Sequence, residues 1–197
     1  ICLAKAPSRP GSPEEGVIDA LGRAADSLGI DTSSLLGGCE RFVHGTTVAT
    51  NALLTHRGAR VGLLTTEGFR DALAIRRGIR ENVWDHRAPY PPQLVPRYLR
   101  LPVGGRIDWR GEESAPLHEA GVRAAVDRFA AERVEAVAVC LFNAYLNPSH
   151  EERAGEILSE ALPEAFIVLS SRAAPIMGEY ERTSTAAVSA FLGPRIS

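Results

Sequence analysis

The stretch RFVHGTTVATNALLTHRGARVGLLTTEGF, residues 41–69, alternates two short apolar runs with one helical pattern. The first apolar run ends at a Gly-Thr-Thr corner, and the second, residues 59–66, also ends at two threonines. Between them, residues 47–58 have the pattern of a helix closed by Gly58. A strand, a helix and a second strand in this order are typical of parallel strands joined by a crossover helix.

The same alternation occurs on both sides of this stretch. Residues 12–28 show helical spacing and are followed by Gly29, which suits the left-handed residue at a helix end. Later segments predict helices near 122–129, 148–162 and 179–193, with buried strands at 135–142 and 165–171. Apolar strands that alternate with helices predict an α/β fold, with a mainly parallel sheet covered by helices on both faces.

Residues 76–117 lack this regularity. The segment is rich in proline, and it follows a short helix predicted within residues 67–78. Within it, residues 98–103 and 106–109 read as two strands of a hairpin. We therefore expect an irregular excursion that interrupts the alternation of strands and helices.

Composition limits the classes of function. The chain has 197 residues, with 22 basic and 24 acidic side chains, so its charge gives no reason to expect nucleic acid or an anionic membrane as the main partner. No apolar run approaches the roughly 18 residues of a membrane span. The three cysteines are far apart and fit reduced thiols of a cytoplasmic protein. Residue 1 is isoleucine and the first methionine is Met177, so we expect a fragment that begins after the natural N-terminus.

The first threonine corner has the residue types of an anion site. Gly45 permits close approach of the backbone, while Thr46 and Thr47 add hydroxyl donors at the start of the expected helix. Asn51 follows one turn later, and His44 precedes the corner as a possible proton donor or ligand. Phosphate or a developing oxyanion is the expected guest. The structural alternative is that a threonine only caps its helix and that the histidine is only hydrogen bonded.

The second threonine corner ends the strand predicted at residues 59–66. Thr65 and Thr66 would lie at the same edge of the sheet as the first corner if both strands run parallel, and two corners at one edge suggest one pocket. The alternative is again a helix cap, with Glu67 as the capping acid.

Two charged segments are further candidates. Arg76 and Arg77 could capture a carboxylate or phosphate, although mixed charges are more often a solvated surface. Glu181 and Arg182 precede three consecutive hydroxyl residues, which are poor helix formers unless they bond a neighbouring loop or pack between lobes. The P-loop, Rossmann, serine-hydrolase and zinc-protease motifs are all absent from the sequence.

Three blocks together resemble the N-terminal region of the hydantoinase A/oxoprolinase family. They are HGTTVATNALLTHRGARVGLLTTEGFRD, VAVCLFNAYLNPSHE and EYERTSTAAVSAFLGP, which occur at residues 44–71, 137–151 and 179–194. The family includes N-methylhydantoinase, 5-oxoprolinase and subunits of acetone and acetophenone carboxylase. The similarity covers nearly the whole chain.

The resemblance implies an actin-like ATPase fold with two ribonuclease-H-like lobes that bind ATP and Mg²⁺. Residues 1–197 would be an N-terminal domain that is incomplete at both ends, since the family's main phosphate motifs lie outside them. The family phosphorylates a carbonyl or amide oxygen and then opens a cyclic amide or carboxylates a ketone. A hydantoinase B-type subunit or domain is the implied partner, and the chain could also form a homo-oligomer.

The resemblance thus implies part of an ATP-dependent cyclic-amide hydrolase. The alternatives are the ATP-using subunit of a ketone carboxylase, or a non-catalytic binding or assembly fragment. Thr46, Thr47 and Asn51 would approach substrate or phosphate, and Thr65 and Thr66 would continue that wall. Arg76 and Arg77 are assigned to substrate selection, and Glu181 and Arg182 to the cleft wall or to packing between lobes. No catalytic base and no metal ligand is identified.

Overall fold

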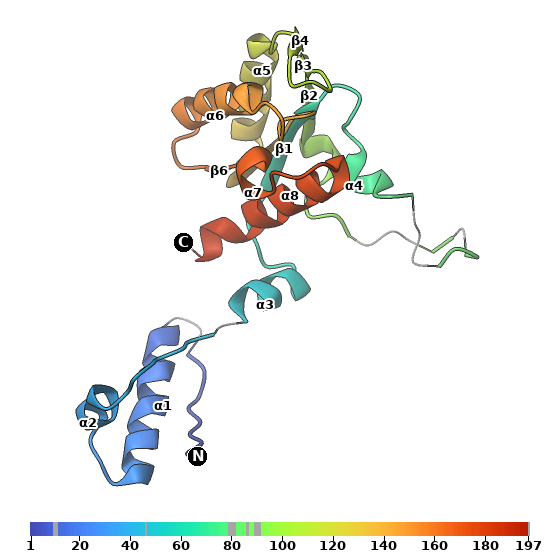
Figure 1. The fold of residues 1–197 in the computed structure, drawn as a ribbon. Helices are drawn as coiled ribbons and strands as arrows, with labels where there is room; N and C mark the ends of the chain where they lie inside the picture. Colours follow the sequence, from blue (N-terminus) through green and yellow to red (C-terminus); the bar gives the residue numbers. More distant parts are fainter. Residues whose placement is uncertain (10–11, 46, 79–81, 86, 89–91, 197) are drawn as a thin grey trace. The chain divides into compact units, whose positions relative to one another are not determined.

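The computed structural model describes the chain except for residues 10–11, 46, 79–81, 86, 89–91 and 197. The chain forms two compact units, residues 1–46 and 47–197. Each unit has its own helices, and every strand among the described residues belongs to the second unit (Figure 1).

The first unit consists of helix α1 (Pro13–Leu28) and the short helix α2 (Thr32–Gly37). The expected end of α1 is confirmed, because Gly29 has φ 69° and its N–H donates to the carbonyl groups of Ala25 and Asp26. At the start of α2, the carboxylate of Asp31 accepts the Ser34 N–H at 2.9 Å. The sequence analysis missed α2.

The prediction that the first apolar run, residues 40–45, forms a short strand is wrong. Residues 41–45 have no regular secondary structure and are exposed, with Val43 at 80%. A strand needs a hydrogen-bonded neighbour, and none of the described strands pairs with this segment. Helix α3 (Val48–Leu54) follows in the second unit and ends before the Gly58 that was expected to close it.

The second unit is built on a four-stranded parallel sheet, as predicted. Its order is β2 (Arg100–Val103), β1 (Val61–Thr66), β5 (Ala136–Cys140) and β6 (Phe166–Leu169). In the register of the two central strands, Leu63 lies opposite Ala138 and Thr65 opposite Cys140. Strands β1 and β5 are buried along their whole length, which explains their unbroken apolar runs.

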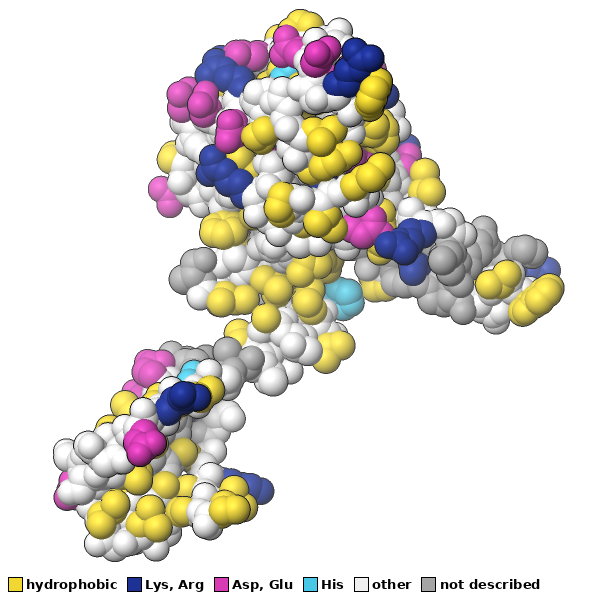
Figure 2. Space-filling view, viewed as in Figure 1, with side chains coloured by type: hydrophobic (Ala, Val, Ile, Leu, Met, Phe, Trp, Pro, Cys, Tyr) yellow, Lys and Arg dark blue, Asp and Glu magenta, His cyan; other side chains and the backbone are white. Residues whose placement is uncertain are grey.

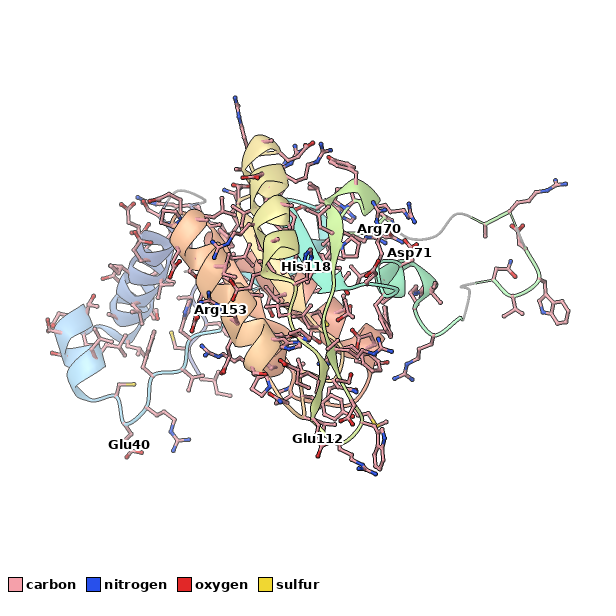
Figure 3. The ribbon with its side chains drawn as sticks, turned by 90° about the horizontal axis from the view of Figure 1, so that it is seen from above. Glu40, Arg70, Asp71, Glu112, His118 and Arg153 are labelled. Atoms are coloured by element: carbon pink, nitrogen blue, oxygen red, sulfur yellow. The ribbon has the colours of Figure 1, made fainter. Side chains whose placement is uncertain are left out.

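Helices cover both faces of this sheet (Figure 1). Helices α5 (Glu119–Ala131) and α6 (Ser149–Ala161) pack on the face that carries Leu64, Val137 and Val139. They are also joined to each other, because Arg153 Nε donates to Glu119 at 2.6 Å (Figure 3). Helix α8 (Glu179–Ile196) packs on the opposite face, against Leu63, Ala136 and Ala138.

The segment between β1 and α5 is irregular, but its hairpin differs from the expected one. Residues 100–103 form β2, which joins the main sheet beside β1, and the hairpin pairs β3 (Arg106–Ile107) with β4 (Glu113–Ala115). The short helices α4 (Ala72–Ile75) and η1 (Arg97–Leu99) precede β2. Asp71 joins them by accepting the Arg97 Nε–H at 2.8 Å, close to Arg70 (Figure 3).

Large hydrophobic side chains remain exposed on both units (Figure 2). Examples are Leu3 at 91% in the first unit and Trp84 at 92% and Met177 at 82% in the second. No described helix has the length and apolar character needed to cross a membrane.

Candidate functional site

The carboxyl-terminal edge of the parallel sheet carries a concentration of buried polar side chains. This is the edge at which open α/β sheets bind ligands. Thr65 and Thr66 end β1 there, as the sequence predicts, and both are buried. Thr66 Oγ1 accepts the N–H of Phe142 at 2.9 Å, whereas Thr65 Oγ1 has no hydrogen-bond partner among the described residues.

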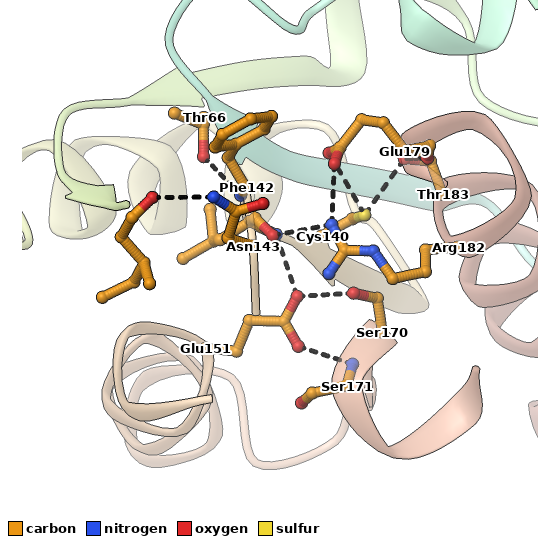
Figure 4. Close-up of polar contacts among 12 residues, drawn as sticks. Thr66, Cys140, Phe142, Asn143, Glu151, Ser170, Ser171, Glu179, Arg182 and Thr183 are labelled. Atoms are coloured by element: carbon orange, nitrogen blue, oxygen red, sulfur yellow. Dashed lines mark hydrogen bonds and ion pairs between the residues drawn. The ribbon is translucent and has the colours of Figure 1, made fainter. Parts of the chain in front are cut away.

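The loop that follows β5 is held from both faces of the sheet (Figure 4). Glu151 of α6 accepts the Leu141 N–H at 2.9 Å, the Ser170 hydroxyl at 2.6 Å and the Ser171 N–H at 2.8 Å. Arg182 of α8 donates from Nη2 to the Leu141 carbonyl at 2.8 Å. Two buried charged side chains therefore fix the backbone at the edge of the sheet.

A second group of polar contacts lies between β5 and the first turns of α8. The Cys140 sulfur lies 3.0 Å from Thr183 Oγ1 and 3.7 Å from Glu179 Oε1, and Arg182 Nη2 donates to Glu179 Oε2 at 2.7 Å. Thr65 is opposite Cys140 in the register, so it belongs to the same group. We call Thr65, Cys140, Glu179, Arg182 and Thr183 the edge cluster.

Burial sets the protonation of the edge cluster. It raises the pKa of the Cys140 thiol to about 12, so this group stays an uncharged thiol near neutral pH. Burial also raises the pKa of Glu179, although the attraction of Arg182 partly opposes that shift. The cationic member of the cluster is Arg182, which is fully buried.

Three buried polar atoms of this cluster have no hydrogen-bond partner within the described part of the chain. They are Thr65 Oγ1, Arg182 Nε and Arg182 Nη1. Such atoms are rare in folded proteins, and each calls for a water molecule or a ligand. Because a guanidinium can only donate hydrogen bonds, its partner would be an acceptor such as an oxygen atom.

The structure places the other predicted residues in several locations. His44 and Gly45 belong to the first unit, and Thr46 lies outside the described residues. Thr47 and Asn51 belong to the second unit, where Asn51 Nδ2 donates to Thr47 Oγ1 at 3.3 Å.

Thr47 and Asn51 are not brought to Thr65 and Thr66. They lie at the start of α3, which packs against the C-terminal part of α8. This contact is at the end of the sheet where β1 begins (Figure 1). The Ala59 N–H donates to the Phe191 carbonyl at that end, far along α8 from the edge cluster.

The two charged segments do come together. Arg77 Nε donates to Glu181 Oε1 at 2.5 Å, and Arg76 lines a pocket beside Tyr180 and Ser184 of α8. Arg182 points to the edge cluster instead.

Sequence reasoning missed Glu151 as a site residue. Its only signal was an acidic residue in the first turn of a helix, which is common for electrostatic reasons alone. Tyr180 and Ser184 lay within a block that was noticed for its run of hydroxyl residues, but nothing in the sequence showed that they line a pocket.

Comparisons with known proteins agree over most of the chain. Residues 1–162 match the family model described as hydantoinase/oxoprolinase N-terminal region. Caprolactamase subunit alpha of Pseudomonas jessenii is 43% identical over 98% of this chain and 28% of its own length. The acetophenone carboxylase gamma subunit of Aromatoleum aromaticum is 36% identical over 96% of this chain and 28% of its own length.

A solved structure supports the same relationship. The crystal structure of the ATP-dependent caprolactamase from P. jessenii superposes with a TM-score of 0.86 at 41% identity, over 97% of this chain and 28% of that chain. The chain therefore spans less than a third of these relatives.

Proposed function

The chain belongs to the hydantoinase/oxoprolinase family, whose N-terminal region it matches, and from this we propose that it forms part of an ATP-dependent enzyme that opens a cyclic amide. The actin-like ATPase class of the fold, with its parallel sheet and helices on both faces, is confirmed by the solved relative. The observation that carries the proposal is the 43% identity to a caprolactamase subunit over nearly the whole chain.

The chemistry proposed for the whole protein is phosphorylation of the amide oxygen, followed by hydrolysis of the ring. Phosphorylation makes the carbonyl carbon more electrophilic, so that water can add to it and the C–N bond of the ring can break, with the nitrogen leaving as the protonated amine. Hydrolysis of the resulting acyl phosphate then gives the carboxylate and phosphate, so the cleavage of ATP drives the ring opening. Within the described residues, the edge cluster is the part suited to this chemistry. In the buried guanidinium of Arg182, Nε and Nη1 have no hydrogen-bond partner among the described residues, and such donors suit a developing oxyanion or a phosphate oxygen.

Neither ATP nor Mg²⁺ is assigned to the described residues. No group of three or more histidine, cysteine or acidic side chains among them is placed to hold a metal ion. The pocket beside Arg76 holds about 210 Å³, below the about 300–1,000 Å³ typical of pockets for drug-sized ligands, so it does not suit a nucleotide.

Two other functions remain as alternatives. An ATP-using subunit of a ketone carboxylase is favoured by the 36% identity to the acetophenone carboxylase subunit, which is lower than the identity to the lactamase. A non-catalytic assembly fragment is favoured because the P-loop and Rossmann phosphate motifs are absent from the sequence. A hydantoinase B-type partner and a cytoplasmic location belong to the same proposal.

The decisive experiment is phosphate release from MgATP by the full-length protein with its co-purifying subunit. The additions are caprolactam, hydantoin, 5-oxoproline, and acetophenone with bicarbonate, each tested alone. Stimulation by a cyclic amide, with the ring-opened product, supports the proposal. Stimulation by the ketone alone supports the carboxylase, and no stimulation by any addition supports the assembly fragment.

The earlier residue assignments enter this proposal as hypotheses. If Thr46, Thr47 and Asn51 contact substrate or phosphate, Thr46→Ala lowers turnover or nucleotide affinity in the full-length protein. If Arg76 and Arg77 select the substrate, exchanging residues 76–78 with those of a relative changes the preferred ring. Unchanged turnover in the first case, or unchanged preference in the second, contradicts that assignment.

A further inference from the structure

A small pocket lies between α4, the segment Pro92–Leu94 and α8. The first two of these lie between β1 and β2 in the sequence, whereas α8 follows β6. The pocket has a volume of about 210 Å³. A water molecule takes about 30 Å³ of liquid, so the space corresponds to about seven waters, which suits one small ring.

The lining combines an apolar wall with a few hydrogen-bonding groups, of which Arg76 alone is charged. Leu73, Leu94 and Ala187 supply much of the wall. Gln93 can both donate and accept, and the hydroxyl groups of Tyr180 and Ser184 can do either. Small-molecule sites in proteins have this composition, with an apolar surface and few polar groups that fix orientation.

We propose that this pocket binds the hydrocarbon ring of a small cyclic amide, and that it thereby contributes to substrate choice. The inference rests on the proposed function, which supplies the amide. A lactam ring offers one N–H donor, one carbonyl acceptor and an apolar remainder. The pocket offers matching acceptors and donors beside an apolar wall.

The position of the pocket supports this assignment. Tyr180 and Ser184 alternate along α8 with Glu179, Arg182 and Thr183 of the edge cluster, so the same two turns of helix line both features. The Arg77–Glu181 ion pair joins the end of α4 to these turns. The walls of the pocket are therefore tied to the group that has free donor atoms at the edge of the sheet.

The test is a variant that fills the pocket without changing the edge cluster. Ser184→Leu adds an apolar side chain at the lining, and leucine forms helices better than serine. The matched control is Thr185→Leu, because Thr185 is the next residue of α8, is exposed and does not line the pocket. Both variants are made in the full-length protein and assayed with its co-purifying subunit.

We expect Ser184→Leu to raise the KM for caprolactam by about 10–200-fold, the range for a misfit of one or a few methylene groups in a pocket. The KM for ATP should change less than about twofold, since a nucleotide does not fit here. Larger lactam rings should lose more than smaller rings. Thr185→Leu should leave the KM for caprolactam at its original value.

Direct binding of caprolactam, measured by ligand-observed NMR without ATP, makes the test independent of turnover. Binding by the unaltered protein that Ser184→Leu abolishes supports the pocket. Equal binding by both proteins, absence of binding by either, or equal losses in the two leucine variants overturns it. If amides still stimulate ATP hydrolysis in that case, the proposed function survives. If amides bind here but stimulate nothing, the proposed function fails and the pocket stands.

Discussion

Glu151 and Arg182 hold the two backbone polar groups of one residue, Leu141, from opposite faces of the sheet. Glu151 on α6 accepts the Leu141 N–H at 2.9 Å, and Arg182 on α8 donates to the Leu141 carbonyl at 2.8 Å. Both residues are fully buried. A strand end that two buried charges fix in this way has little freedom to move relative to either helix.

The first prediction concerns the acidic half of this arrangement. Glu151→Ala removes the acceptor of two buried donors and one partly buried donor, and each buried donor left unpaired costs about 1–3 kcal/mol. We expect the local opening free energy of residues 141–147 to fall by about 3 kcal/mol or more. Hydrogen exchange of these amides in the full-length protein measures it. Glu152→Ala is the control, because the Glu152 side chain is half-exposed and its ion pair with Arg172, at 3.6 Å, lies on the surface. We expect the exchange of the same amides to be unchanged in this variant.

The second prediction concerns the basic half. Arg182→Met leaves Glu179 in a largely buried position without its ion pair, and breaking a buried pair costs about 3–5 kcal/mol. Adding Glu179→Gln should recover part of this loss, since the amide carries no charge to desolvate. The free energy of local unfolding around α8, measured by hydrogen exchange, checks both variants. A double variant that is no more stable than Arg182→Met would show that the pair is not coupled.

The third prediction uses the thiols. Cys2 and Cys39 are exposed, whereas Cys140 is buried and its pKa is raised to about 12. In the folded protein, a thiol-alkylating reagent at pH 8 should label the first two rapidly and Cys140 only after denaturation. Mass spectrometry of the peptides distinguishes the sites. Rapid labelling of Cys140 would contradict the burial.

The same shift predicts a pH dependence with a definite sign. The folded pKa of Cys140 lies above its ordinary value of 9.0, so the folded protein holds the proton more tightly than the unfolded chain. The stability from this group is fully present below pH 9 and is lost as the pH rises toward about 12. Cys140→Ser should reduce the loss of stability over this window.

The fourth prediction tests the packing of the central strand. A methyl group added at Gly62 of β1 would lie 2.4 Å from Phe129 Cε1 of α5, which is an impossible contact. Gly62→Ala should therefore destabilise the second unit by about 1–3 kcal/mol, the usual cost of overpacking. Gly22→Ala is the control, because nothing lies within 4 Å of the added methyl group in α1. That change should be neutral or slightly stabilising, since alanine favours helices.

The sequence predicted the parallel sheet because its strands leave a local signal. Residues 136–140 are an uninterrupted apolar run, and such runs occur where a strand is covered on both faces. The long helices α1, α5, α6 and α8 were equally readable from their spacing. These features depend on residues close together in the chain, so no knowledge of distant contacts was needed.

The errors in the sequence-based predictions arose where contacts between residues distant in the chain decide the structure. Residues 41–45 have strand-like composition but no described strand beside them, and β2 pairs with β1 instead of its neighbour in sequence. Glu151 looks like any acidic residue at a helix start until the fold buries it against Leu141 and Ser170. The pocket likewise exists only because α4, residues 92–94 and α8 meet.

The last prediction separates a structural threonine from a functional one at the end of β1. Thr66 Oγ1 accepts the Phe142 N–H at 2.9 Å, so Thr66→Val leaves that donor unpaired and should cost about 1–3 kcal/mol. Thr65 Oγ1 is buried without a partner among the described residues, so Thr65→Val removes a hydroxyl that folding left unsatisfied. That change should be neutral or stabilising by about 1 kcal/mol.

The two threonine variants should also differ in activity. If the proposed function holds, the Thr65 hydroxyl is available to a ligand oxygen, and Thr65→Val should lower amide-stimulated ATP hydrolysis by about tenfold, which corresponds to one lost hydrogen bond of about 1.4 kcal/mol. Hydrogen exchange and steady-state assays of the full-length protein supply the two readouts. A Thr65→Val protein that is as destabilised as Thr66→Val would show that its hydroxyl serves the fold. A protein that is stable and fully active would show that the hydroxyl serves neither the fold nor the reaction.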